Sequence, residues 1–352
     1  MSYQWYKTSK PDNNGELISG ATSSTYTPST LGVGTVYYYA IVTNTNNNVN
    51  GSKVVSSKSS AAKIIIDIFA THLINFYNEN LDFIETVSRQ EGIINPSNIK
   101  LGTWYKANET TSITNHNLNG NITFYAISNV QEITNQDELA YINIHSVTLA
   151  GKYILLNDIV LDKNGAGFDA NGWIPIGPDN SSLSAFTGIF NGNNHKITNL
   201  WMNYRPSSND DVGLFGSAYN AQIKNLGVEI AKGKEVRGNW SVGGIVGRFS
   251  FGNITNSYSI GNISGRNHVG GIAGIADGNI VNSYSIGNVT CSNSYTGGIA
   301  GSTSGNIVNS YSIGNVKGSD KYTGGIAGYV RGNIVNSYSI GNVRGFLVTP
   351  AA

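Results

Sequence analysis

The sequence predicts an all-β protein dominated by a parallel β-solenoid, a fold in which one repeated unit coils upon copies of itself. The first observation is a repeat near the C-terminus, in which Gly247, Gly274, Gly301 and Gly328 lie 27 residues apart. A fixed period of about 20 to 50 residues is typical of one supersecondary unit stacked on its copies. The second is that the unit is rich in Ile, Val, Tyr, Thr and Ser, is punctuated by Gly and Asn, and lacks a helical apolar stripe. We therefore expect each unit to supply three short strands and three turns.

Stacking of the units would place like residues above like residues. Three apolar columns are expected: Ile245, Ile272, Ile299 and Ile326; Ile260, Ile286, Ile313 and Ile340; and Ile263, Val289, Val316 and Val343. Asn256, Asn282, Asn309 and Asn336 are expected to form an asparagine ladder. The direction of the tyrosine column stays open, because alternation from Ile280 points Tyr284 inward whereas a turn at Asn282 would point it outward.

A less regular region precedes the repeats and is expected to cap them. The segment DVGLFGSAYNAQIKNLGV (211–228) aligns with a repeat as a degenerate first copy, followed by a longer loop, EIAKGKEVRGNWS (229–241). An atypical terminal copy suits the end of a stack, where one side has no neighbour. Further strands are expected within 151–162, 173–177 and 186–202. Residues 135–143 predict one helical turn, with Asn135 as its N-cap.

Residues 129–352 resemble the GLUG-motif proteins of bacterial surfaces. The resemblance rests on four near-identical copies such as VGGIAGIADGNIVNSYSIGNVTC, with the repeats spanning 212–345, and on the preceding YILLNDI, WIPIG and FTGIFNGNNHKITNL. This family occurs in bacterial adhesins and in non-catalytic regions of some immunoglobulin-cleaving proteases. The resemblance implies a right-handed parallel β-helix.

Residues 1–62 predict a first small β module. The segments YQWYK, LISGATSSTYTPST and VGTVYYYAIVTN are similar to the bacterial immunoglobulin-like domains that recur in surface proteins. In such a sandwich the core tryptophan lies on the third strand. Here it is Trp5, so the resemblance implies a partial sandwich whose first two strands are absent. We expect the chain to begin inside a domain.

Residues 63–128 predict a second small module. The order FYNEN, TVSRQEG, TWYKANET and NITFYAI is similar to the Listeria–Bacteroides repeat and implies a β-grasp-like fold. Its core is expected to include Trp104, Tyr105, Phe124, Tyr125 and Ala126. The run IIIDIF (64–69) is expected to be a linker strand between the two modules. The predicted domains are thus 1–62, 63–128, a capping region over 129–240, and regular coils over 241–352.

Composition excludes several classes of protein. Charged residues are 12% of the chain and the net charge is +1, so there is no basic stripe for nucleic acid. No apolar run is long enough for a membrane span. The single Cys291, in the variable loop between two repeats, leaves no intrachain disulfide. GFLVTPAA after the last copy offers no proper cap, so we expect this chain to be part of a longer one.

The alternative of a β-helix enzyme acting on carbohydrate needs paired carboxylates or a metal. Residues 242–352 contain no Glu and only Asp277 and Asp320, so a site could lie only in the capping region. The candidates there are Asp158, Asp162, Asp169, Asp210 and Asp211. The segment 162–169 lacks the spacing of a calcium loop, and His72, His116, His145, His195 and His268 are scattered without an HExxH motif. We therefore predict no catalytic, cofactor-binding or metal residues and no cofactor.

The leading hypothesis is a non-enzymatic segment of an extracellular or bacterial cell-surface adhesin, with the two small modules as spacers and the solenoid as a rod for adhesion or display. Its partner would be a protein or glycan on a host or neighbouring cell. The alternatives are a lyase or glycosidase with its site in 129–240, and a purely structural spacer. A distinctive site is expected in 129–240 or in the loops around Arg266, Cys291 and Lys321.

Overall fold

The computed structural model describes residues 1–11, 14–28, 34–66, 70–143, 146–178, 184–204, 211–319 and 322–345. The chain forms two compact units, Met1–His72 with Arg89–Gly92, and Leu73–Ser88 with Ile93–Ala352. Nearly all regular structure is strand, so the predicted all-β class is confirmed. The four-part division into domains stays a prediction.

The first module is one antiparallel sheet. Its strands are β1 (Ser2–Thr8), β2 (Glu16–Leu17), β3 (Gly34–Thr45), β4 (Val54–Lys58) and β5 (Ala62–Ile66). The long β3 pairs with β1 along one edge, and β4 and β5 share its other edge. Trp5 is half-buried, and its Nε1 donates to the Ser23 carbonyl at 2.9 Å. All five strands lie in this single sheet, so the immunoglobulin-like sandwich stays a prediction.

The expected linker strand is not separate from the first module. Ile64, Ile65 and Ile66 belong to β5 and pair with the start of β3, because strand pairing satisfies their backbone groups. The remaining residues of that run, 67–69, lie outside the described residues.

The second module is a small mixed fold. Its elements are β6 (Thr71–Tyr77), β7 (Phe83–Gln90), β8 (Gly92–Ile94), α1 (Pro96–Ile99), β9 (His116–Leu118) and β10 (Ile122–Tyr125). The sheet order is β10-β6-β7, with β10 parallel to β6. Trp104, Phe124 and Tyr125 are buried as predicted, whereas Tyr105 and Ala126 are half-buried.

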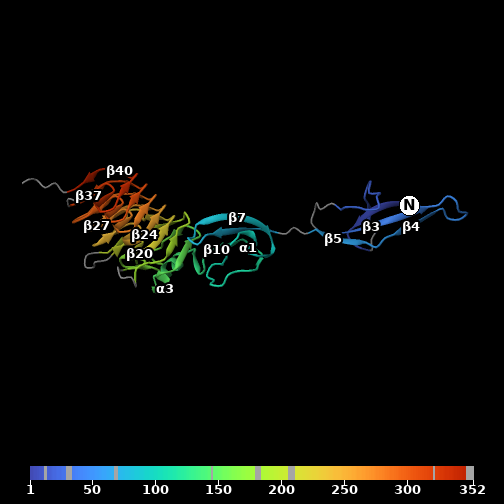
Figure 1. Cartoon of the computed structure of the whole chain (residues 1–352), viewed down its shortest axis with the longest axis horizontal. Helices are drawn as coiled ribbons and strands as arrows, with labels where there is room; N and C mark the ends of the chain where they lie inside the picture. Colours follow the sequence, from blue (N-terminus) through green and yellow to red (C-terminus); the bar gives the residue numbers. More distant parts are fainter. Residues whose placement is uncertain are drawn as a thin grey trace, which may run out of the picture. The chain divides into compact units, whose positions relative to one another are not determined.

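The solenoid consists of four sheets that run along its length among the described residues (Figure 1). The first sheet contains β11 (Val130–Ile133), β12 (Lys152–Leu155), β16 (Ile189–Asn191), β20 (Phe215–Lys224), β24 (Val246–Thr255), β28 (Ala273–Ala276), β33 (Ala300–Thr303) and β38 (Ala327–Val330), with β29 (Asn279–Val281), β34 (Ile307–Val308) and β39 (Ile334–Val335). The second contains β13 (Ile159–Val160), β17 (Lys196–Leu200), β21 (Gly227–Ile230), β25 (Tyr258–Ile260), β30 (Tyr284–Ile286), β35 (Tyr311–Ile313) and β40 (Tyr338–Ile340).

The other two sheets complete each coil. The third contains β14 (Phe168–Asp169), β15 (Gly172–Trp173), β18 (Met202–Asn203), β22 (Glu235–Arg237), β26 (Asn262–Gly265), β31 (Val289–Cys291), β36 (Val316–Lys317) and β41 (Val343–Arg344). The fourth contains β19 (Asp211–Val212), β23 (Ser241–Val242), β27 (His268–Gly270), β32 (Thr296–Gly297) and β37 (Thr323–Gly324). The expectation of three strands per unit was therefore wrong, because turns at Gly and Asn divide each coil more finely.

The stacking register matches the predicted alignment. Tyr258 pairs with Tyr284 and Ile263 with Val289 in parallel ladders. The degenerate copy also aligns, since Val212 pairs with Val242. Figure 1 shows these coils following one another in chain order, from green through orange to red.

The predicted columns differ in which way they face. Ile245, Ile272 and Ile299 are fully buried, and Ile263, Val289 and Val316 are 1% exposed. The Ile260, Ile286, Ile313 and Ile340 column stacks as expected but lies on the outer face, where Ile340 is 56% exposed. The reason is the left-handed conformation at Asn282, with φ 51°, which breaks the alternation. Ser283 and Ser285 then point inward, and Tyr284 points outward.

The asparagine ladder is present and longer than predicted. Each side-chain amide donates to the amide oxygen of the preceding coil at 3.0–3.3 Å, through Asn225, Asn256, Asn282, Asn309 and Asn336. The ladder begins at Asn191, which accepts from Asn225. Residues Asn225 to Asn336 of the ladder all have φ of 49–52°, a region that asparagine tolerates better than most residues.

The second module packs against the outer face of the first sheet, near the N-terminal end of the solenoid. The amide of Asn191 donates to the Leu81 carbonyl, and the Lys224 ammonium donates to the Asn80 carbonyl and pairs with Asp82. A shared apolar cluster joins the two parts and contains Tyr77, Leu81, Tyr125, Val130 and Ile154. The module therefore adds a second apolar cluster, separate from the solenoid core, and covers the outer side of β12, β16 and β20.

Two short helices complete this end. α2 (Gln136–Tyr141) follows Asn135, whose side chain accepts from the Glu138 backbone N–H at 3.0 Å. The predicted N-cap is therefore confirmed. α2 carries Leu139 into the solenoid core, and α3 (Ser146–Leu149) adds Leu149.

Candidate functional site

The acidic candidates that the structure describes each have a hydrogen-bond partner within the fold. Asp158 Oδ1 accepts from the Lys196 backbone N–H at 3.1 Å and lies 3.2 Å from His195 Nδ1. The hydrogen bond from Lys196 lowers the pKa of Asp158. Asp211 is 4% exposed and accepts from Arg248 Nε at 3.1 Å. These carboxylates lie at the starts of β13 and β19, in different sheets.

The other acidic candidates stabilise turns. Asp162 Oδ1 accepts from the Asn164 backbone N–H at 3.0 Å, and Asp169 Oδ1 accepts from the Asn171 backbone N–H at 2.6 Å. Such contacts are typical of Asx turns. Asp210 lies outside the described residues. Across the part of the chain that the structure describes, no three His, Cys, Asp or Glu side chains are grouped to hold a metal ion.

Of the three loop residues expected near a distinctive site, Arg266, Cys291 and Lys321, Cys291 has a structural role. Cys291 is not a loop residue, because it ends β31 and is 1% exposed with Sγ 2.9 Å from the Asn267 carbonyl oxygen. Burial follows from its place two residues beyond Val289, on the inward side of the strand. Arg266 is exposed, and Lys321 and His145 lie outside the described residues.

His268 lies in an aromatic column on the fourth sheet. Its ring stacks on Tyr295 with centroids 4.7 Å apart, and its Nδ1 lies 3.0 Å from Ser302 Oγ. Burial, together with the positive charge of Arg248, lowers the pKa of His268 to about 4. The imidazole is therefore neutral near pH 7.

This lowered pKa predicts a loss of stability in acid. An unfolded histidine has a pKa of about 6.5, so below that pH the unfolded chain binds a proton that the folded chain does not. The stability contribution is complete above about pH 6.5 and is lost as the pH falls toward 4, by about 2 kcal/mol after allowance for solvent screening. Urea unfolding at pH 7 and pH 4.5 measures this loss. His268→Phe keeps the ring stack and should lose less stability over the same range; an equal loss would contradict the assignment.

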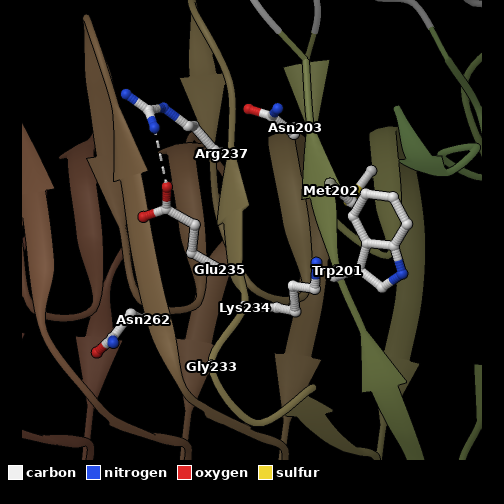
Figure 2. A pocket seen from close by; sticks show the side chains of 8 residues that line it. All are labelled: Trp201, Met202, Asn203, Gly233, Lys234, Glu235, Arg237 and Asn262. Atoms are coloured by element: carbon white, nitrogen blue, oxygen red, sulfur yellow. Dashed lines mark hydrogen bonds and ion pairs between the residues drawn. The ribbon is translucent and has the colours of Figure 1, made fainter. Parts of the chain in front are cut away.

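A pocket of about 420 Å³ lies on the outer face of the third sheet (Figure 2). It is lined by Trp201, Met202, Asn203, Gly233, Lys234, Glu235, Arg237 and Asn262. In Figure 2, Trp201 and Lys234 lie at one side and the Glu235–Arg237 pair at the other. The Lys234 ammonium is 5.2 Å from the Trp201 ring centroid, and Arg237 Nη1 donates to Glu235 Oε1 at 3.2 Å.

Strand register explains why these side chains meet. Asn203 on β18 pairs with Arg237 on β22, and Glu235 pairs with Asn262 on β26. Alternation along β18 and β22 buries Met202 and Val236 and turns their neighbours outward. A tight turn, in which the Lys234 N–H donates to the Ala231 carbonyl at 3.0 Å, carries Lys234 back toward Trp201.

All residues that line the pocket except Asn262 belong to 129–240, the region expected to hold a distinctive site. The sequence analysis singles out none of these residues. The sequence predicts a long loop over 229–241, whereas this segment contains β22 and a turn. One available signal is the density of charge in KGKEVR (232–237), in a chain with only 12% charged residues. The pocket offers an indole, two cations, one carboxylate and two amides. It lacks the second carboxylate that glycoside hydrolysis requires.

Comparison with known proteins bears on the coil next to this pocket. A family model described as the GLUG motif matches residues 238–264. The chain carries a GLUG motif. The matched residues follow β22, pass through β23, β24 and β25, and end in β26, so this GLUG segment is one coil of the solenoid. Its first residue directly follows Arg237 of the pocket, and Asn262 lies within it.

One solved structure that is similar to this chain is the crystal structure of "a putative immunoglobulin A1 protease from Bacteroides ovatus". The similarity has a TM-score of 0.47 and 24% sequence identity, and it covers 62% of this chain and 68% of that one. No curated protein matches the GLUG-containing chain. Within its described residues, no helix has the length and apolar character needed to cross a membrane.

Proposed function

We propose that this chain is a non-enzymatic segment of a secreted or cell-surface bacterial protein, with the solenoid acting as a rod for adhesion or display. The observation that carries this proposal is the repeated outer face of the second sheet over β25, β30, β35 and β40, whose strands contain only Tyr, Ser and Ile. Tyr258, Tyr284, Tyr311 and Tyr338 stack there with ring centroids 4.9–5.2 Å apart and interplanar angles of 4–7°.

The chemistry of this face favours contact with a surface rather than turnover. The stacked rings cover one another, so the column exposes ring edges and phenolic hydroxyls next to the isoleucine column. Beside them, Asn262, Asn288 and Asn315 each accept from the backbone N–H of the next coil at 3.0–3.1 Å. Such a face repeats the same groups coil after coil, which suits a repeated partner or several weak contacts at once.

The acidic residues support the same proposal. General acid–base catalysis needs a carboxyl group that is free to exchange a proton with a substrate. Asp211 is buried against Arg248, and Asp158 accepts the Lys196 backbone N–H. Their contacts hold turns and strands in place, so we assign them structural roles.

Binding of the labelled 352-residue chain to glycan arrays, matrix proteins and intact cells tests the proposal. We expect saturable binding to at least one surface and no degradation of a polysaccharide panel. Absence of binding on all three would overturn adhesion and leave a spacer. Polysaccharide cleavage that is abolished by Asp158→Asn or Asp169→Asn would support the enzyme alternative instead.

A further inference from the structure

We propose that the Trp201 pocket binds an acidic sugar, a pyranose that carries a carboxylate. This inference deepens the proposed function. It rests on one part of that proposal, namely that the solenoid binds ligands on its surface. The pocket residues are Trp201, Asn203, Lys234, Arg237 and Asn262, with Glu235 as the partner of Arg237.

The size and the aromatic wall indicate a small ring-shaped ligand. Pockets for small molecules are commonly about 300–1,000 Å³, and this one, at about 420 Å³, suits one or two sugar units. Trp201 is half-buried, so part of the indole is accessible at the rim, and buried Met202 lies beneath. A pyranose has an apolar face of C–H groups that can lie against an indole, which a phosphate ion lacks.

The charges indicate a carboxylate on that ring. Lys234 and Arg237 outnumber Glu235, so the pocket carries a net positive charge. Glu235 accepts from Nη1 of Arg237, and the Arg237 side chain is 30% exposed. A guanidinium binds carboxylates with paired N–H donors. A ligand carboxylate between Lys234 and Arg237 would accept from the Lys234 ammonium and from exposed N–H groups of the Arg237 guanidinium.

The amides supply the specificity for a sugar. Asn203 and Asn262 are both exposed on the pocket rim, on β18 and β26 at either side of β22. The Asn203 amide offers donors and an acceptor, and the Asn262 amide, whose Oδ1 accepts from the Asn288 backbone N–H, offers its N–H donors; both match the hydroxyl groups of a sugar. An acidic peptide would satisfy the cations but present neither a C–H face nor vicinal hydroxyls. The combination therefore favours an acidic sugar over an acidic peptide.

Calorimetric titration of the full chain tests this site, with oligosaccharides of a hexuronic acid as the probe and the corresponding neutral oligosaccharides and an acidic peptide as comparisons. We expect binding of the acidic oligosaccharide that weakens as salt is raised, and at least tenfold weaker binding of the neutral one. Trp201→Ala and Lys234→Met should each lower the affinity at least fivefold.

Lys232→Met is the matched control, because Lys232 is an exposed cation on the same turn that does not line the pocket. It should leave the affinity within twofold. Unfolding curves show whether each variant folds. If Trp201→Ala does not fold, Lys234→Met still tests the site. Equal binding of acidic and neutral sugars, tighter binding of the peptide, or an equal effect of Lys232→Met would overturn the site. If the chain binds cells or arrays but not the acidic oligosaccharide, this inference fails while the proposed function stands.

Discussion

Replacement of Gly244 by alanine is expected to destabilise the solenoid by about 3 kcal/mol, at the upper end of overpacking effects. A Cβ at this position would overlap Ser259 Oγ and lie 2.7 Å from Ser259 Cβ and 2.8 Å from the Gly271 carbonyl oxygen. The obstacles are a buried side chain and the backbone of the next coil, so neither can move without disturbing the stack. Denaturant unfolding, with the midpoint and slope fitted together, measures the loss.

Two further variants test the cause of this loss. Gly120→Ala is the control, since nothing lies within 4 Å of a Cβ there, and it should change stability by less than about 0.5 kcal/mol. Ser259→Gly removes two of the three close contacts, so it should rescue part of the loss in Gly244→Ala. If the double variant were no more stable than Gly244→Ala, the steric explanation would be wrong.

Replacement of Asp82 by alanine is expected to weaken the joint between the second module and the solenoid by about 3 kcal/mol. The Lys224 side chain is 8% exposed and pairs with Asp82, so the change leaves a buried ammonium with only the Asn80 carbonyl as its described partner. Removing one partner of a buried pair costs about 3–5 kcal/mol, and Asp82, which is 49% exposed, places this pair at the lower end. Hydrogen exchange over residues 73–128 should accelerate.

A double-mutant cycle separates the ion pair from simple loss of contacts. Lys224→Met with Asp82→Ala should be more stable than Asp82→Ala alone, because no unpaired charge remains. Glu229→Gln is the control: its pair with Lys196 is partly solvent-exposed, with the Lys196 and Glu229 side chains 38% and 30% exposed, so this change should cost much less stability than Asp82→Ala. A loss as large as that of Asp82→Ala would mean that burial of Lys224 is not the cause.

The joint also changes the role expected for the second module. From sequence, both N-terminal modules are expected to be spacers. Tyr77 Oη donates to Asn193 Oδ1 at 3.3 Å, and Leu81 is fully buried in the shared cluster. Because these contacts bury side chains of β12, β16 and β20, we expect the module to stabilise the first coils rather than to act only as a spacer.

The local sequence pattern was sufficient to predict the contacts of residues whose neighbours are the equivalent residues of adjacent repeats. The 27-residue spacing predicted which residues stack, since parallel pairing of identical units places Ile272 over Ile245 and Asn282 over Asn256. The N-cap at Asn135 was predictable because it depends on residues three apart. The direction of the tyrosine column was not predictable. It depends on the left-handed φ at Asn282, which the alternation of apolar and polar residues does not reveal.

The sequence by itself determined the solenoid, its repeat, its apolar columns and its asparagine ladder, because those follow from local composition and a fixed period. Only the tertiary structure decided where the surface chemistry lies. Trp201 and Lys234 are separated by a full coil in the chain and meet because β18 and β22 pair in register. Lys224 and Asp82 meet because the second module packs against the first coils. Contacts between distant segments depend on register and docking, which no local pattern encodes.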